Sequence, residues 1–308
     1  MSGHNIVPFH ISIPNQRIPV LLSSPHSGIK IWPGLEKKLN VDEDGLCEDA
    51  DLFIHKVYEP MLAEGATILT ANYHRYTVDL NRDISSRPLY SDGRLITGLF
   101  PETDFQGNNI YRNCEKEDQS SCVKEPSIEF SEKNSEKNSE KNSKVQVDPK
   151  NALQQKILTE VYHPYHQALR EQIDELKKEF GWCLLVECHS IKRYVPTLVK
   201  MPLDDLTVGT ASGLSLPRYL LEPLKQKIAS EKLSVSFDDP FSGGFITRNY
   251  FDLKNRVATV QFEMAKDVYL KEAGRQIDEA KMPGIQKSML STILFLKEEL
   301  HTFFDAAS

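Results

Sequence analysis

Short apolar runs alternate along this chain with longer stretches in which apolar residues recur at helical spacing. Strands are predicted at residues 20–22, 66–71, 76–80, 183–188, 233–237 and 257–263. Helices are predicted at residues 46–64, 149–180, 216–232 and 285–301. This alternation predicts an α/β fold with a mixed, mostly parallel sheet that helices cover on both faces.

One segment, at about residues 114–147, departs from this pattern. It contains the tetrapeptide Ser-Glu-Lys-Asn three times in succession, starting at Ser131. Such a tract buries too little apolar surface to offset the entropy of ordering it. We therefore expect a disordered low-complexity insertion within a single domain that spans residues 1–308.

Composition narrows the range of partners and compartments. The 308 residues include 37 basic and 44 acidic side chains, a net charge of −7, which argues against nucleic acid or an anionic membrane as the main partner. The five cysteines have neither zinc-finger nor redox spacing. The first ten residues lack a secretory pattern, and no apolar stretch approaches the roughly 20 residues of a membrane helix. We expect a cytoplasmic protein.

Two histidines follow or end predicted strands. His26 lies in Ser-Pro-His-Ser-Gly, directly after the strand at 20–22, and His189 ends the strand at 183–188. Ligands of α/β proteins bind at the carboxyl ends of strands, and two imidazoles with a carboxylate suit a zinc site with an open position. Ser27 and Ser190 are candidates for orienting the two rings. Taken alone, His26 also fits an ordinary Pro-Gly turn.

The carboxylate of such a site is ambiguous in the sequence. Glu48, Asp49 and Asp51 lie near the start of the predicted helix 46–64, where acidic residues are common because they balance the helix dipole. Asp49 and Asp51 are two positions apart and do not share a helical face, so at most one of them is expected as a ligand.

Two arginines suited to binding a carboxylate flank the predicted strand 76–80. Arg82 comes after Asn81, and Arg75 precedes the same strand. A guanidinium group forms a planar fork that matches a carboxylate, although an ion pair of Arg82 with Asp79 or Asp83 is the plainer alternative.

The last candidates lie in and before the predicted strand 257–263. Gln261 and Glu263 point to one side of that strand, and Glu263 is either edge-exposed or a general base. Gly243-Gly244, in the segment that ends at Arg248, permits a close backbone approach, although paired glycines also occur in plain loops.

Two further patterns are weaker. His163 and His166 have a spacing that can bind a metal on a helix, but Pro164 lies between them and no acid completes the set nearby, so helix packing is the better interpretation. Ser190 lacks the Gly-x-Ser-x-Gly elbow of a serine hydrolase.

Taken together, these segments resemble the N-formylglutamate amidohydrolase family over about residues 20–270, apart from the insertion. The segments that carry the resemblance are Pro25-His26-Ser27-Gly28, Glu48-Asp49-Ala50-Asp51, Asp79-Leu80-Asn81-Arg82, Cys188-His189-Ser190-Ile191, Phe241 to Arg248 and Gln261-Phe262-Glu263. The family is related in fold to zinc carboxypeptidases. Glu187 departs from the pattern, since similar sequences often have aspartate there.

The resemblance implies zinc-dependent cleavage of N-formyl-L-glutamate to formate and L-glutamate, a step of histidine degradation. It implies one Zn²⁺ per chain, with His26, His189 and Asp49 as ligands and Asp51 or Glu48 as the alternatives to Asp49. It also implies Glu263 as the general base, Asn81 and Arg82 as the pair that binds a substrate carboxylate, with Arg82 also a catalytic residue, and Arg248 as a helper. Arg75 remains a second candidate for that carboxylate from its place in the sequence. The rival expectations are a related zinc amidase or carboxypeptidase for another N-acyl amino acid or peptide, and a non-catalytic binding protein. The sequence does not indicate an oligomeric state.

Overall fold

One mixed sheet of seven strands runs through the computed structural model, which describes residues 7–85, 97–112, 152–271 and 274–306. The strand order is β1-β3-β2-β4-β7-β5-β6, and four of the six pairings are parallel. The strands are β1 (Phe9–Ser12), β2 (Val20–Ser24), β3 (Thr67–Ala71), β4 (Cys183–Ile191), β5 (Leu206–Gly209), β6 (Val235–Phe237) and β7 (Val257–Ala265). The predicted α/β class with a mostly parallel sheet is confirmed.

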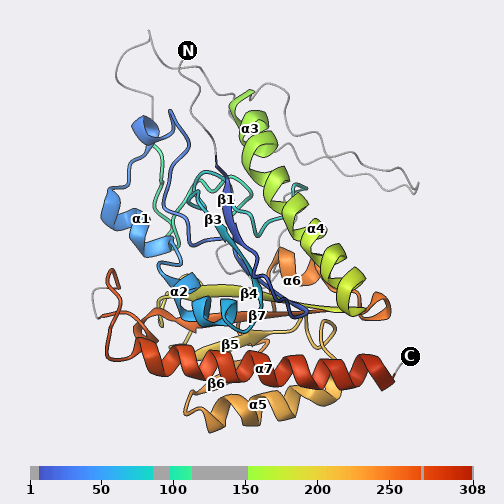
Figure 1. Ribbon diagram of the computed structural model, residues 1–308. Coiled ribbons are helices and arrows are strands. Elements are labelled where there is room, and N and C mark those ends of the chain that lie inside the picture. The colour runs from blue at the N-terminus through green and yellow to red at the C-terminus, as the bar shows by residue number, and fades with distance from the viewer. Residues whose placement is uncertain (1–6, 86–96, 113–151, 272–273, 307–308) are drawn as a thin grey trace, which may run out of the picture.

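Helices cover both faces of this sheet (Figure 1). The helices are α1 (Glu43–Asp49), α2 (Ile54–Tyr58), α3 (Ala152–Ile157), α4 (His163–Phe180), α5 (Leu221–Ser230), α6 (Phe245–Tyr250) and α7 (Met282–Ala306). One buried core joins the sheet to α2, α5 and α7, and a second joins it to α3 and α4. Side chains of β4 enter both cores alternately, Leu184 and Val186 the first and Cys183 and Leu185 the second. This two-sided burial explains why the sequence of β4 is almost continuously apolar.

The order of the strands reverses between β2 and β4. The chain passes from β2 to β3 on one side and later returns to β4 on the other side of β2. Because β2, β4 and β7 are parallel, their carboxyl ends meet at one edge of the sheet. A reversal of strand order at this edge is where α/β folds bind ligands.

The predicted helix at 46–64 is wrong as a single element. Helix α1 ends at Asp49, and α2 begins only at Ile54, after Phe53 has adopted a left-handed φ of 59°. The backbone N–H of Asp51 donates to the carbonyl oxygen of His26 at 2.9 Å instead of continuing the helix. The apolar periodicity corresponds to two short helices, and the chain between them is extended where Asp51 bonds to His26.

The predicted strand at 76–80 is also wrong, since this segment forms turns. The N–H of Thr77 donates to the carbonyl of His74 at 2.9 Å, and that of Asp79 donates to Leu99 at 2.8 Å. Tyr76, Val78 and Leu80 are buried, but so are Thr77 and Asp79 between them. The alternating pattern therefore reflects a fully buried turn, and not one face of a sheet.

The long helical pattern before the fourth strand is confirmed where the structure describes it. Helix α3 passes through a π-helical turn, Leu158–Tyr162, into α4, which ends before Gly181 at φ 79°. The remaining predicted strands and helices agree with β2, β3, β4, β6, β7, α5 and α7 to within a few residues at each end. The predicted insertion at 114–147 lies outside the described residues. None of the helices in the described ranges has the length and apolarity that a membrane crossing requires.

Candidate active site

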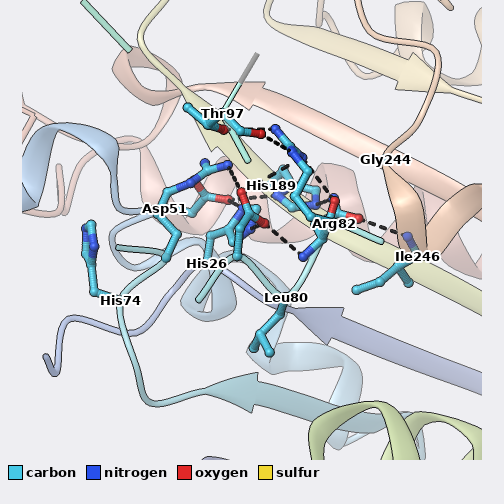
Figure 2. Close-up of polar contacts among 12 residues, drawn as sticks. His26, Asp51, His74, Leu80, Arg82, Thr97, His189, Gly244 and Ile246 are labelled. Atoms are coloured by element: carbon cyan, nitrogen blue, oxygen red, sulfur yellow. Dashed lines mark hydrogen bonds and ion pairs between the residues drawn. The ribbon is translucent and has the colours of Figure 1, made fainter. Parts of the chain in front are cut away.

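Two histidines and one aspartate converge at the carboxyl ends of β2 and β4. His26 follows β2, His189 lies near the end of β4, and Asp51 lies in the extended segment between α1 and α2. One potential ligand atom from each side chain lies within 4.8 Å of the others, and all three side chains are buried (Figure 2). Two imidazoles and a carboxylate are the donor set of a catalytic zinc site that keeps a position open.

The environment of His26 leaves one ring nitrogen available to a metal ion. Its Nε2 lies 2.7 Å from Asp79 Oδ1. Although burial raises the pKa of Asp79, Arg75, Arg82 and His26 together hold it well below its usual range, so Asp79 is an acceptor and the Nε2–H donates. Burial lowers the pKa of His26, which favours the neutral ring. Its Nδ1 is buried, has no hydrogen-bond partner among the described residues, and lies 3.8 Å from Asp51 Oδ2.

His189 is held in a similar way. Its Nε2 lies 2.6 Å from Glu187 Oε1, and its Nδ1 lies 2.9 Å from Asp51 Oδ2. Burial lowers the pKa of His189, but Glu187 and Asp51 raise it well above its usual value. Metal binding would displace the proton between Nδ1 and Asp51. A carboxylate behind each histidine is the usual means of orienting an imidazole ligand.

Asp51, and not Asp49, is the carboxylate that the structure brings to the histidines. The Oδ2 of Asp49 instead accepts hydrogen bonds from Tyr76 Oη at 2.7 Å and from the N–H of Phe105 at 2.9 Å. Glu48 lies at the surface, where it pairs with Lys192 at 2.9 Å. The family resemblance favoured Asp49 as the third ligand, with Asp51 as an alternative, and the break in the chain after α1 brings Asp51 to the histidines instead.

Glu263 lies on β7 directly beside His189 in the sheet register. It is partly buried, and burial raises its pKa to about 8, while His189 opposes that rise. Gln261 Nε2 lies 3.2 Å from one Glu263 oxygen. A carboxyl group whose pKa lies near neutrality suits proton transfer.

The four predicted substrate-binding residues each have different hydrogen-bond partners. Arg75 Nη2 donates to Asp79 at 2.7 Å, and its guanidinium carbon lies 4.6 Å from the centre of the Phe105 ring. Arg82 turns toward Thr97, to whose carbonyl its Nε donates at 2.8 Å, as Figure 2 shows. Arg82 Nη1 also lies 3.8 Å from Asp79 Oδ2, so the ion pair considered as the plainer alternative is present, and it is mostly buried.

Asn81 and Arg248 complete that set. Asn81 Nδ2 lies 3.0 Å from His189 Nε2, and its Oδ1 accepts the N–H of Ile246 at 2.9 Å (Figure 2). Arg248 Nη2 donates to Ser242 Oγ at 2.7 Å.

The paired glycines allow the close approach that their presence predicted. A Cβ on Gly244 would lie 2.1 Å from Asn81 Nδ2, so any other residue here would force the Asn81 side chain to move. The N–H of Gly244 donates to Gln261 Oε1 at 2.7 Å. The glycine thus links the β7 side of the site to the segment that carries Asn81 and Arg82.

Sequence reasoning missed the two residues that orient the histidines. Glu187 and His189 are two apart on a strand and share a face, so a lone acid in this apolar run was a usable signal. No local signal identified Asp79, because its contact with His26 spans 53 residues. Ser27 and Ser190 do not orient the rings: Ser190 Oγ lies 2.8 Å from Tyr269 Oη, and Ser27 Oγ has no hydrogen-bond partner among the described residues.

His163 and His166 lie outside the site, as predicted. His163 is exposed on α4. His166 Nδ1 lies 2.8 Å from Tyr250 Oη, and its Nε2 lies 3.0 Å from the carbonyl oxygen of Leu80, so this ring packs α4 against the site segment.

The chain is similar to known proteins over most of its length. The profile of the N-formylglutamate amidohydrolase family matches residues 18–270. An N-formylglutamate deformylase from Pseudomonas aeruginosa is 34% identical over 285 residues, which is 92% of this chain and 94% of the relative. One from Pseudomonas putida is 30% identical over 264 residues, 85% of each chain. The crystal structure of an N-formylglutamate amidohydrolase from Ralstonia eutropha JMP134 superposes with a TM-score of 0.72 at 19% identity, covering 96% of this chain and 99% of the other.

Proposed function

The chain belongs to the N-formylglutamate amidohydrolase family, and on that premise we propose that it is a zinc-dependent hydrolase that cleaves N-formyl-L-glutamate to formate and L-glutamate. The observation that carries the proposal is the buried cluster of His26, Asp51 and His189 with Glu263 beside it. The reaction would serve histidine degradation. In this proposal the chain forms a single hydrolase domain and works in the cytoplasm.

The residues present fit a zinc ion. The Nδ1 of His26 is buried, has no hydrogen-bond partner among the described residues and lies 3.8 Å from Asp51 Oδ2. An orphaned buried polar atom of this kind is costly unless a ligand satisfies it. His26, His189 and Asp51 would hold the ion, and Asp79 and Glu187 would orient the two rings. When bound, zinc supplies the Lewis acidity that makes water a nucleophile near neutral pH and polarises a carbonyl group.

Glu263 moves the protons in this proposal. It accepts a proton from the attacking water as the oxygen of that water bonds to the formyl carbon. It then donates the proton to the amide nitrogen as the carbon–nitrogen bond breaks, which releases formate and the free amino group of glutamate. Burial raises the pKa of Glu263 to about 8, which supports the donating role. The positive charge of a bound zinc ion would favour the carboxylate form that accepts the first proton.

Arg75 and Arg82 are the first candidates for binding the substrate's carboxylates. Arg75 is tied to Asp79, which in turn bonds His26, so its guanidinium is held close to the reacting group. Arg82 and Asn81 are adjacent in sequence and anchored to Thr97 and Ile246. Such fixed donors orient a substrate so that its amide lies over the reacting groups. Arg248 is a further candidate from the α6 segment.

The rival functions differ in what they need from the site. A zinc amidase or carboxypeptidase acting on another N-acyl amino acid or peptide would use the same metal ligands and base, with a different pocket. A non-catalytic binding protein has no need of Glu263 beside a metal site, and its presence favours the enzyme.

The test is formate release from N-formyl-L-glutamate, with zinc supplied and then removed by a chelator. N-acetyl- and N-succinyl-glutamate serve as the comparison substrates. We expect zinc-dependent release from the formyl compound and slower cleavage of the other two. Zinc binding with cleavage of only another N-acyl compound would favour the related amidase, and a chain that neither binds zinc nor responds to it would favour the binding protein.

A further inference from the structure

The segment that presents Asp51 has no regular secondary structure of its own. It runs from Ala50 to Phe53 between two short helices. Its backbone bond from the N–H of Asp51 to the carbonyl of His26 ties together two of the three candidate ligands. What fixes the ends of this segment therefore decides where the Asp51 carboxylate lies.

A lysine from the opposite end of the chain holds the first of these ends. Lys266 immediately follows β7, and its Nζ donates to the carbonyl oxygen of Glu48 at 2.5 Å and lies 3.4 Å from that of Cys47. These are carbonyls of the last turn of α1, which helix geometry leaves without partners and where the helix dipole favours a cation. The last turn of α1 contains no basic residue of its own.

A tyrosine three residues further along holds the second end. Tyr269 Oη donates to the carbonyl oxygen of Leu52 at 2.7 Å and lies 2.8 Å from Ser190 Oγ. Ser190 adjoins His189. Tyr269 therefore joins the residue after Asp51 to the residue after the histidine that Asp51 contacts.

Lys266 and Tyr269 are both buried although each carries a polar group. Lys266 is 5% exposed and Tyr269 is fully buried. Burying an amine or a hydroxyl group is unfavourable unless hydrogen bonds replace those made with water. Lys266 and Tyr269 bond to the backbone carbonyls of Cys47, Glu48 and Leu52, which lie on either side of Asp49-Ala50-Asp51.

We infer that Lys266 and Tyr269 are positioning residues that clamp the two ends of the Asp51 segment and so set the metal affinity of the site. The inference rests on the proposed metal-dependent function. A binding constellation has to be held to within about 0.5 Å of its working geometry, and loss of an outer partner typically weakens metal binding by about 10- to 100-fold. Releasing either end would let the Asp51 carboxylate move relative to His26 and His189.

The experiment measures zinc affinity by competition with a chromophoric chelator, using the full chain. Lys266→Met removes the donor but keeps most of the apolar stem, and Lys266→Arg keeps a donor. Tyr269→Phe removes one hydroxyl group. Lys254→Met is the matched control, because Lys254 is an exposed lysine at the other end of β7, away from Asp51.

We expect Lys266→Met and Tyr269→Phe each to weaken zinc binding by about 10-fold or more. Lys266→Arg should recover part of that loss, and Lys254→Met should match the wild-type chain. The visible spectrum of bound Co²⁺, which reports ligand geometry, should change in Lys266→Met. If Lys266→Met does not fold, Tyr269→Phe alone decides the matter.

Two results would overturn the inference in distinguishable ways. If the variants bind zinc as tightly as the wild-type chain while their thermal midpoints fall, Lys266 and Tyr269 only stabilise the fold, and the proposed metal site stands. If the wild-type chain itself binds no zinc, the proposed metal site fails, and the inference fails with it.

Discussion

Asparagine substitutions at Asp51 and Asp49 give a matched pair, because each replaces one carboxylate oxygen of a buried aspartate and the two positions are only two residues apart. Asp51 Oδ2 lies 2.9 Å from His189 Nδ1 and 3.8 Å from His26 Nδ1. Asp49 Oδ2 accepts hydrogen bonds from Tyr76 and Phe105. Only the first position faces the candidate metal ligands, so only there should the loss of charge alter metal binding.

The expected magnitudes follow from these contacts. Asp51→Asn replaces an anionic ligand by a neutral amide, which should cost more than the roughly 10- to 100-fold typical of an outer partner. We therefore expect zinc affinity to fall by at least about 100-fold, or about 2.8 kcal/mol. In Asp49→Asn the amide oxygen can still accept both bonds, since both go to the same oxygen. We expect its zinc affinity to change by less than ~10-fold and its unfolding free energy by about 1 kcal/mol.

The assay is chelator competition for zinc on the two variants and the wild-type chain, with urea unfolding of the metal-free proteins beside it. Unfolding separates a loss of ligand from a loss of structure. If Asp49→Asn weakened zinc binding as much as Asp51→Asn, or more, the assignment of Asp51 as the third ligand would be refuted.

Three further predictions test other parts of the site. Glu263→Gln should lower kcat by about 10²- to 10⁴-fold while zinc affinity is retained, and an active variant would remove Glu263 as the base. Asp79→Asn would turn an amide toward Arg75 and weaken the bond to His26, so zinc affinity should fall by about 10- to 100-fold; an unchanged affinity would show that Asp79 does not orient His26. Arg82→Ala should raise KM for N-formyl-L-glutamate by about 10- to 100-fold, the loss of a charge-assisted hydrogen bond, with a smaller effect on kcat. An unchanged KM would place Arg82 outside substrate binding.

The sequence by itself determined most of the framework and the two histidines. Short apolar runs identified β2, β3, β4 and β7, because nearly all the side chains of these strands are buried. Placing His26 and His189 at strand ends was enough to bring them to one edge, since parallel strands end together.

Only the tertiary structure decided the third member of the cluster and the partners behind the histidines. A local sequence pattern does not distinguish Asp49 from Asp51. The hydrogen bond from the N–H of Asp51 to the carbonyl oxygen of His26, 25 positions earlier in the chain, accompanies the break after α1 that places Asp51 in the cluster. Asp79 reaches His26, and Lys266 reaches Glu48, over separations of 53 and 218 residues. Periodicity identifies the helix or strand to which a residue belongs. These contacts depend instead on how distant elements pack, and no short stretch of sequence specifies that packing.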